Sequence, residues 1–167
     1  MVNNKEHSGE QMRGKPKTVY FGCSMLGGYS FVKREELAEF PGLIKGLGCR
    51  LASDHQTQPG VIEREAKLDP TYIHDRDYAW ELESDLGIFE ISNPSLGVGG
   101  EISDMIYMGK PVLLLFKRGL EEKISAYMWG KAGSGYVGSP VECHAYKDHE
   151  DVRKIIKAFI DIHSSEG

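Results

Sequence analysis

The chain has 167 residues, a length that suits one compact domain and leaves little room for a second. Hydrophobic residues make up 40% and charged residues 27%, which excludes a disordered chain and favours a soluble globular protein. The formal net charge is −5 and no basic run occurs, so binding to a nucleic acid polymer is not expected. The longest apolar run, Pro111 to Phe116, is too short to span a membrane and suits a buried strand.

Cysteine and histidine usage argues against a disulfide framework and against a metal site. The three cysteines, Cys23, Cys49 and Cys143, have no close pairs, and the six histidines lack ligand spacing. We therefore expect reduced thiols, no metal or other cofactor, and a cytoplasmic protein. Residues 1–16 are polar, without the apolar core of a secretion signal, and we interpret them as a disordered tail before a domain at 17–163.

In chain order, segments typical of strands alternate with segments that have helical spacing. The expected strands are Thr18–Cys23, Cys49–Ala52, Leu86–Ile91, Val112–Phe116 and Val141–Tyr146. The expected helices are 31–47 (broken or kinked at Pro41), 70–84 (capped by Asp69), 101–108, 121–129 and 148–162. This alternation predicts a parallel sheet covered on both faces. We predict a single-domain α/β fold, a flavodoxin-like or Rossmann-like three-layer sandwich with five parallel strands in the order 2-1-3-4-5.

Two glycine-bearing turns follow the first and third expected strands. The first runs from Gly22 to Gly28, and the second runs from Asn93 to Gly100, just before the helix expected at Glu101. In the predicted sheet both lie at the switch point, where ligands bind and where glycine lets the backbone approach them. Ser24 and Ser95 add hydroxyl donors. The glycines alone would also fit plain tight turns, but two such turns side by side favour a phosphate or sugar-phosphate site.

Three polar side chains are placed to serve such a site. Asp77 shares one helix face with Ile73 and Trp80, and a carboxylate on an inward face is either paired structurally or used. Glu101 alone would fit an acid favoured by the helix dipole, and Tyr20 alone would fit a core aromatic. Together, two carboxylates facing one pocket indicate acid–base or nucleophilic chemistry on a sugar bond.

Three motifs, taken together and in order, resemble a known family. They are YFGCSxxGG from Tyr20 to Gly28, IHxxD from Ile73 to Asp77, and PSLGVGxE from Pro94 to Glu101. The set resembles the nucleoside 2-deoxyribosyltransferase superfamily and is most similar to its 2'-deoxynucleoside 5'-phosphate N-hydrolase (Rcl) branch. The similarity covers roughly Val19 to Tyr146 and includes a late Ser125-Ala126 element. It implies that 17–163 is a catalytic domain of this type.

The resemblance implies a role for each matching residue. Glu101 would be the nucleophile at the anomeric carbon, Asp77 the acid–base partner near the leaving base, and Tyr20 a group that positions or polarises the reacting atoms. Residues expected to hold the 5'-phosphate are Gly22, Ser24, Gly27, Gly28, Ser95, Gly97 and Gly99. Ser125 would complete that pocket from the neighbouring subunit of a homodimer. His55 and Met25 would lie near the base.

The expected function is N-glycosidic hydrolysis of 2'-deoxynucleoside 5'-monophosphates to free base and 2-deoxyribose 5-phosphate. One departure bears on it, because Met25-Leu26 stands where relatives carry an arginine, so phosphate affinity would rest on backbone amides and hydroxyls. Two alternatives stay open. One is a transferase that exchanges bases on unphosphorylated deoxynucleosides, and the other is a nucleotide-binding protein without turnover.

Overall fold

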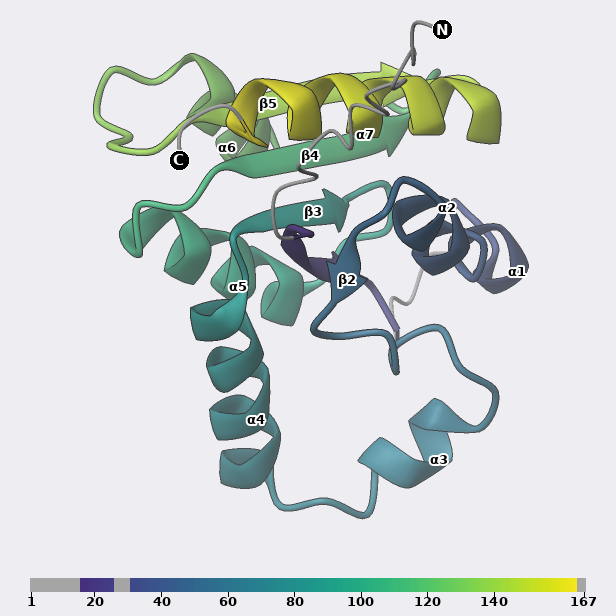
Figure 1. Cartoon of the computed structure of the whole chain (residues 1–167). Helices are drawn as coiled ribbons and strands as arrows, with labels where there is room; N and C mark the ends of the chain where they lie inside the picture. Colours follow the sequence, from purple (N-terminus) through teal and green to yellow (C-terminus); the bar gives the residue numbers. More distant parts are fainter. Residues whose placement is uncertain (1–15, 26–30, 165–167) are drawn as a thin grey trace, which may run out of the picture.

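The computed structural model describes residues 16–25 and 31–164 (Figure 1). Five strands form one sheet in the order β2-β1-β3-β4-β5, and every neighbouring pair is parallel. The strands are β1 Thr18–Cys23, β2 Arg50–Leu51, β3 Leu86–Glu90, β4 Val112–Lys117 and β5 Val141–Tyr146. The predicted fold class and strand order are confirmed. The tail predicted at 1–16 lies outside the described residues, apart from Pro16.

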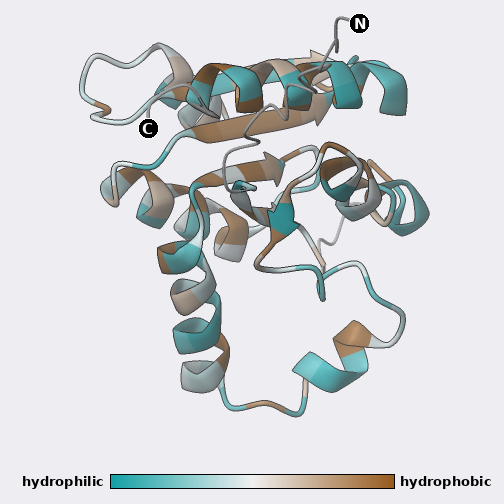
Figure 2. Ribbon diagram, viewed as in Figure 1, coloured by the Kyte–Doolittle hydropathy of each residue, from teal (hydrophilic) through white to brown (hydrophobic). Residues whose placement is uncertain are grey.

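Helices cover both faces of this sheet, so the molecule has three layers. The helices are α1 Arg34–Leu37, α2 Phe40–Gly46, α3 Val61–Glu65, α4 Pro70–Glu83, α5 Leu96–Tyr107, α6 Ala126–Gly130 and α7 His149–Ser164, with a 3-10 turn, η1, at Lys131–Gly133. Side chains of α2 and α7 pack on one face of the sheet, and side chains of α4, α5 and α6 pack on the other (Figure 1). The strands between them are largely hydrophobic, whereas α3, α4 and α7 carry hydrophilic residues outward (Figure 2).

Alternation along β1 decides on which side of the sheet Tyr20 lies. Val19 and Phe21 belong to the core under α2 and α7, whereas Tyr20 belongs to the core that contains Ile102 of α5. Successive strand residues point to opposite faces, so Tyr20 and Gly22 share the α5 side. The tyrosine predicted as a site residue is therefore on the same side of the sheet as Glu101.

Helix α4 begins as the sequence predicts. The side chain of Asp69 accepts hydrogen bonds from the backbone N–H groups of Thr71 at 2.9 Å and Tyr72 at 3.2 Å, and Pro70 occupies the first helical position. The cap satisfies amides that have no partner within the helix. The predicted pieces of 31–47 are also confirmed, because α1 ends at Leu37 and Pro41 lies in the first turn of α2.

Helix α5 begins five residues earlier than predicted. Ser95 is its N-cap and accepts a hydrogen bond from the N–H of Val98 at 3.3 Å. Gly97, Gly99 and Gly100 therefore lie within the helix rather than in a loop. Each glycine costs a helix about 1 kcal/mol, but the serine cap and the packing of α5 on the sheet offset that cost. Glu101 consequently lies in the second turn.

Two further expectations about helices were wrong or incomplete. The predicted helix 121–129 is replaced by α6, which begins only after Ser125, because Ser125 has extended backbone and caps the helix by accepting from Met128 N–H. Helix α3 was not predicted. It begins after Gly60, whose φ of 68° belongs to the left-handed region that favours glycine.

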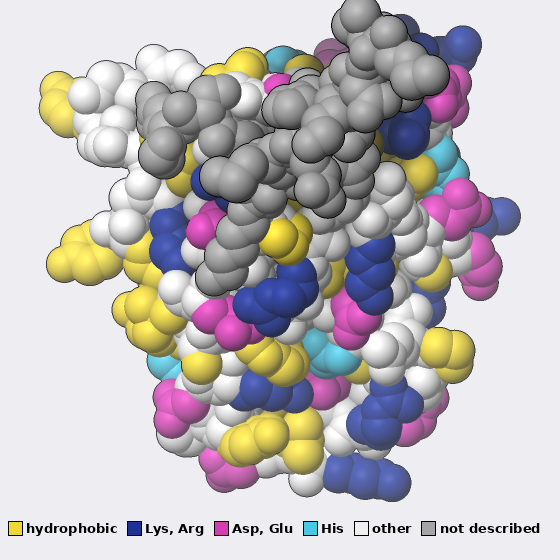
Figure 3. All heavy atoms as spheres, in the orientation of Figure 1, with side chains coloured by type: hydrophobic (Ala, Val, Ile, Leu, Met, Phe, Trp, Pro, Cys, Tyr) yellow, Lys and Arg dark blue, Asp and Glu magenta, His cyan; other side chains and the backbone are white. Residues whose placement is uncertain are grey.

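The surface carries both signs of charge. On the face shown in Figure 3, acidic and basic side chains are interspersed rather than separated. Across the described ranges 16–25 and 31–164, no helix combines the length and the apolar character needed to cross a membrane.

Candidate active site

Three elements supply the three predicted catalytic residues: β1 carries Tyr20, α4 carries Asp77 and α5 carries Glu101. The Tyr20 hydroxyl and Glu101 Oε2 are both buried, and the hydroxyl of Tyr20 acts on the Glu101 carboxyl group as a hydrogen-bond donor. The charges of Glu101 and Asp77 both act on Tyr20, and the charge of Asp77 acts on Glu101. The fold thus brings the three groups into one electrostatic neighbourhood.

The Glu101 carboxyl group lies between the end of β1 and the first turn of α5. A Cβ atom added at Gly22 would be 2.9 Å from Glu101 Oε2, and one added at Gly97 would be 4.0 Å from Oε1. The same atom at Gly22 would be only 2.6 Å from the buried Phe89 ring. Glycine at position 22 therefore makes the room that the carboxyl group occupies.

Burial sets the protonation of Glu101 and Tyr20. Burial, reinforced by the charge of Asp77, raises the pKa of Glu101 to about 7. Burial and the nearby carboxylates hold the pKa of Tyr20 well above its ordinary value. Near neutral pH, Glu101 thus exists in both ionisation states while Tyr20 keeps its proton and can donate it in a hydrogen bond.

Asp77 is partly buried and has a cationic neighbour. Its side chain is 15% exposed, and its Oδ1 accepts from Nε of Arg76 at 2.9 Å. Burial raises the pKa of Asp77, and the bond to Arg76 opposes the rise. The carboxylate is therefore paired with Arg76, which is one of the two interpretations of its inward position, and its charge also acts on Tyr20 and Glu101.

Glu81 is a third carboxyl group of this neighbourhood, and the sequence reasoning missed it. It lies one helical turn after Asp77 on α4, is 2% exposed, and its Oε2 has no partner among the described residues. Burial, followed by the charges of Glu101, Asp104 and Asp77, raises the pKa of Glu81 to about 8. The sequence signal that could have identified Glu81 is its four-residue spacing from Asp77, which places both carboxyl groups on one face of α4.

We expect Glu81→Gln to stabilise the protein increasingly as the pH rises. Folding holds a proton on Glu81 up to a pH of about 8, whereas the unfolded chain loses it near its ordinary pKa, so the cost of this residue to stability grows as the pH rises between those values and remains above them. Glutamine removes the cost, with a gain on the order of 2 kcal/mol at pH 8, or several degrees in Tm. Thermal unfolding of both proteins at pH 5 and pH 8 measures it. An equal difference in Tm at the two pH values would contradict the assignment.

The predicted phosphate residues divide between two sides of α5. Gly97 faces Glu101, whereas a Cβ added at Gly99 would lie 3.5 Å from Met128 Cε on the opposite side. On that opposite side a cavity of about 520 Å³ opens between α5 and the segment that leads into α6. Ser95, Gly99 and Ser125 line it, but Tyr20, Asp77 and Glu101 do not. Ser95 joins the two sides, because its Oγ lies 3.8 Å from the Cβ position of Gly97.

Both serines that line this cavity are helix caps, and capping leaves each of them one hydrogen-bond donor for a ligand. Ser95 Oγ accepts from Val98 N–H and Ser125 Oγ accepts from Met128 N–H, so each hydroxyl hydrogen remains available to an anion. Lys123 lines the same cavity and adds a cation. The sequence reasoning missed Lys123, because only the fold brings it next to Ser95.

The turn after β1 is tied to the turn after β3. Ser24 Oγ donates to the carbonyl oxygen of Pro94 at 3.3 Å, so its hydroxyl hydrogen is engaged within the protein. Asn93 Oδ1 accepts from Phe31 N–H at 2.7 Å and Val32 N–H at 3.1 Å. The two turns thus meet at the switch point, as predicted. Of the remaining expected residues, Met25 is partly buried, and Gly27 and Gly28 lie outside the described residues.

His55 lies beside Asp77 rather than in an exposed loop. Its ring centroid is 4.9 Å from that of Trp80, and its Nε2 is 3.3 Å from Nη2 of Arg76. Burial and the charge of Arg76 lower the pKa of His55. The side chain of His55 is only 17% exposed, so it is largely shielded from solvent.

Comparison with known proteins identifies the family. The 5-hydroxymethyl-dUMP N-hydrolase of Mus musculus is 30% identical over 156 residues, which span 91% of this chain and 84% of that protein. A Trichoplax adhaerens relative, which carries the provisional name 2'-deoxynucleoside 5'-phosphate N-hydrolase 1, is 43% identical over 120 residues, covering 71% of this chain and 78% of its own. The chain belongs to the 2'-deoxynucleoside 5'-phosphate N-hydrolase family. The resemblance seen in its motifs is confirmed, and no family model matches the chain.

Solved structures place this N-hydrolase family member in the same fold as two other proteins. The CMP N-glycosidase BcmB of Clostridium botulinum aligns with a TM-score of 0.61 at 19% identity, covering 86% of this chain and 99% of that one. The solution structure of BlsM aligns with a TM-score of 0.59 at 23% identity, covering 87% and 93%. At such identities the likeness concerns the fold.

Within the described part of this family member, no group of three or more His, Cys, Asp or Glu side chains is placed to hold a metal ion. The site chemistry available to those residues is that of three carboxyl groups, on Asp77, Glu81 and Glu101, a protonated tyrosine, and a separate cavity with two serines and a lysine. An N-glycosidic bond to deoxyribose calls for such carboxyl groups.

Proposed function

We propose that this protein hydrolyses the N-glycosidic bond of 2'-deoxynucleoside 5'-monophosphates, releasing the free base and 2-deoxyribose 5-phosphate. The names of its relatives support this substrate class. The observation that carries the proposal is the buried Glu101 carboxyl group, which lies between Gly22 and Gly97 near Tyr20 and Asp77. A protein that only binds an anion gains nothing from two carboxyl groups, Glu101 on α5 and Asp77 on α4, close to the phosphate-binding end of α5.

In the proposed reaction Glu101 is the nucleophile. Its ionised oxygen forms a bond to the anomeric carbon while the bond from that carbon to the base nitrogen breaks, and Asp77 supplies a proton to the leaving base. Water then displaces Glu101 from the sugar and gives its proton to Asp77. The carboxylate stabilises positive charge that develops on the sugar, and this charge forms more readily in deoxyribose because the 2'-hydroxyl group is absent. Tyr20 holds Glu101 by donating from its hydroxyl.

The phosphate group is proposed to bind at the N-terminus of α5. Ser95, Gly97 and Gly99 lie in the cap and first turn of this helix, where backbone N–H groups and the helix dipole favour an anion. The glycine-bearing turn after β1 lacks the arginine that the family resemblance leads us to expect. Lys123 takes its place, because it lines the cavity with Ser95. Binding the phosphate there lets remote binding energy orient the sugar.

The proposal is tested by product analysis. The protein is incubated with 2'-deoxynucleoside 5'-monophosphates, the matching ribonucleotides and unphosphorylated deoxynucleosides, each with and without a second free base, and products are separated by chromatography. We expect equal amounts of free base and 2-deoxyribose 5-phosphate from the deoxynucleotides alone. Appearance of the second base in a new nucleoside would support the transferase alternative, and unchanged substrates would support a nucleotide-binding protein.

The pH dependence of kcat/KM should report the ionisation of Glu101. A nucleophile reacts as the carboxylate, and the pKa of Glu101 is raised to about 7, so the rate should rise with pH and reach half of its plateau near pH 7. An ordinary carboxylate would instead give a plateau already at pH 6. Initial rates between pH 5 and pH 9 with a subsaturating deoxynucleotide measure this. A flat profile across that range would contradict the role.

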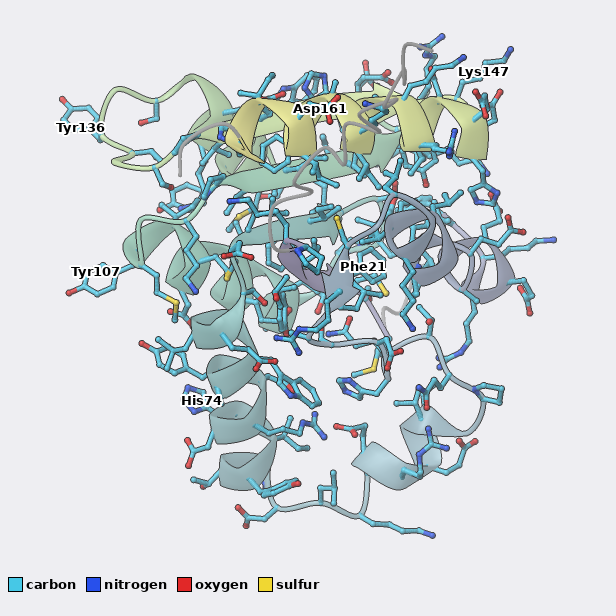
Figure 4. All side chains as sticks on the ribbon, in the orientation of Figure 1. Phe21, His74, Tyr107, Tyr136, Lys147 and Asp161 are labelled. Carbon is cyan, nitrogen blue, oxygen red and sulfur yellow. The ribbon has the colours of Figure 1, made fainter. Side chains whose placement is uncertain are left out.

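A homodimer with Ser125 acting across the interface is part of the proposal. Large apolar side chains stand exposed around α5 and α6: Leu96, Tyr107, Tyr127 and Tyr136. Tyr107 and Tyr136 project outward on the same side of the molecule (Figure 4). A surface of this kind is typical of protein interfaces. In the single chain, Ser125 lines the same cavity as Ser95, so the subunit that supplies it has to be tested.

Mixing the Ser125→Ala and Glu101→Gln variants tests which subunit supplies Ser125 to the site. If Ser125 acts across the interface, heterodimers of Ser125→Ala and Glu101→Gln contain one site with both native residues, and activity returns after subunit exchange. Each variant alone supplies the baseline, and sedimentation measures the oligomeric state. A monomer, or mixtures that stay at baseline, would contradict the shared site.

We also propose that 17–163 is the catalytic domain and that the protein is cytoplasmic, which its reduced cysteines support.

A further inference from the structure

Arg76 on α4 contacts several side chains beside the candidate site. Its Nη1 and Nη2 donate to Oε1 and Oε2 of Glu65 on α3 at 2.9 Å and 2.8 Å, and its Nε donates to Asp77 Oδ1 at 2.9 Å. The guanidinium carbon lies 4.8 Å from the centre of the Trp80 ring, and the side chain is 14% exposed. A bidentate ion pair and a stacked ring fix the plane of the guanidinium group.

This arrangement leaves part of Asp77 for another partner. The contacts that Arg76 makes with Asp77 both go to Oδ1, so Oδ2 is not used by the arginine. The bond to Arg76 also opposes the effect of burial on the pKa of Asp77, which favours the carboxylate form. Arg76 therefore influences both the orientation and the charge of Asp77.

The same guanidinium group determines where His55 carries its proton. Nη2 of Arg76 lies 3.3 Å from His55 Nε2, and an arginine N–H can only donate, so Nε2 must accept. A neutral imidazole that accepts at Nε2 has its hydrogen on Nδ1. His55 Nδ1 is buried and has no hydrogen-bond partner among the described residues. A buried donor without a partner is costly unless a ligand supplies an acceptor.

We propose that Arg76 is a positioning residue that orients Asp77 through Oδ1 and fixes His55 with its hydrogen on Nδ1, so that Asp77 Oδ2, the oxygen that would pass the proton to the leaving base, and the His55 Nδ1–H donor both remain for the base of the substrate. This inference rests on the proposed function, because it assumes that the base leaves beside Asp77. It deepens that function by naming the group that prepares the base end of the site. The base would need an acceptor that can take a hydrogen bond from His55.

The charged and titratable groups around Asp77 come from several elements of the fold. They are Arg76 and Glu81 on α4, Glu65 on α3, His55 after β2, Glu101 on α5 and Tyr20 on β1. Arg76 is the cation of this set, and His55 is neutral above its lowered pKa. Removing the arginine therefore leaves burial and the charge of Glu65 to raise the pKa of Asp77 further.

The test compares Arg76→Gln and Arg76→Lys with the native protein by NMR and kinetics. In the native protein, ¹⁵N shifts are expected to show His55 neutral at pH 7.5 with its hydrogen on Nδ1. In Arg76→Gln, the ¹³C carboxyl titration of Asp77 should move to higher pH and the Nδ1–H form of His55 should lose its dominance. Base release should fall about 10–100-fold in kcat, as is usual for residues that orient a reacting group, with KM within a few-fold. Arg76→Lys keeps the charge and should lie between the two.

The matched control is Arg50→Gln. Arg50 on β2 is exposed and pairs at 3.5 Å with Glu83, which lies six residues after Asp77 on α4. This variant should leave both NMR readouts unchanged. The proposal is overturned if native His55 carries its hydrogen on Nε2, or if Asp77 titrates alike in all Arg76 variants. If Arg76→Gln does not fold, the native tautomer and Arg76→Lys still decide. The NMR readouts need no turnover, so a protein without hydrolase activity but with these shifts would contradict only the proposed function.

Discussion

Glu101→Gln is expected to lower the rate of base release by at least about a thousandfold, which corresponds to about 4 kcal/mol in the activation free energy. Glutamine keeps the size of the side chain but has no negative charge to offer the anomeric carbon. Nucleotide affinity should stay within a few-fold, because the phosphate site that we propose lies at the cap of α5 and does not include Glu101. Initial rates and isothermal titration with a deoxynucleoside 5'-monophosphate measure the two quantities.

Thermal unfolding provides the control for this substitution. Glu101 is buried with its pKa raised to about 7, so its charged form is disfavoured in the folded protein, and the neutral amide should not lower Tm at pH 7. A variant that retains native turnover would exclude Glu101 as the nucleophile. Loss of affinity equal to the loss of rate would instead assign the residue to ground-state binding.

Gly22→Ala is expected to damage both stability and turnover. The added Cβ would lie 2.6 Å and 2.7 Å from two atoms of the Phe89 ring and 2.9 Å from Glu101 Oε2, all within the interior. Overpacking of this kind costs about 1–3 kcal/mol. Tm should therefore fall by several degrees, and base release should fall because Glu101 is displaced from its place near Tyr20.

Gly46→Ala is the matched control for that substitution. Gly46 ends α2 on the surface, and nothing lies within 4 Å of a Cβ added there. Alanine favours a helix over glycine by up to about 1 kcal/mol, so the control should keep or raise Tm and keep native turnover. Equal behaviour of the two alanine variants would show that Gly22 does not make room for Glu101.

The sheet was predictable because its strands carry strong local signals. The apolar runs at 112–117 and 18–23 are buried on both faces, and the glycine-bearing turns after β1 and β3 meet where the topology brings them together. The cap at Asp69 was predictable for the same reason, since it depends on adjacent residues. The start of α5 was not, because three glycines suggest a loop locally and only the cap at Ser95 and the packing of α5 decide otherwise.

Residues that depend on contacts between distant segments were beyond the sequence pattern. Glu81 is buried only because α4 packs beside α5, and Lys123 reaches the cavity only because α6 begins late, after Ser125. The sequence did not indicate a partner for Arg76, because that partner, Glu65, lies on α3, a helix that was not predicted. Charged side chains show their partners only once the fold is known.

A crystal structure of the Glu101→Gln variant with a 2'-deoxynucleoside 5'-monophosphate tests the proposed roles most directly. We predict the anomeric carbon at roughly 3–3.5 Å from the side chain at position 101, with the base beside Asp77 and the phosphate at the N-terminus of α5 near Ser95. A nucleotide bound with its sugar away from position 101, or with its phosphate against Asp77, would contradict those roles.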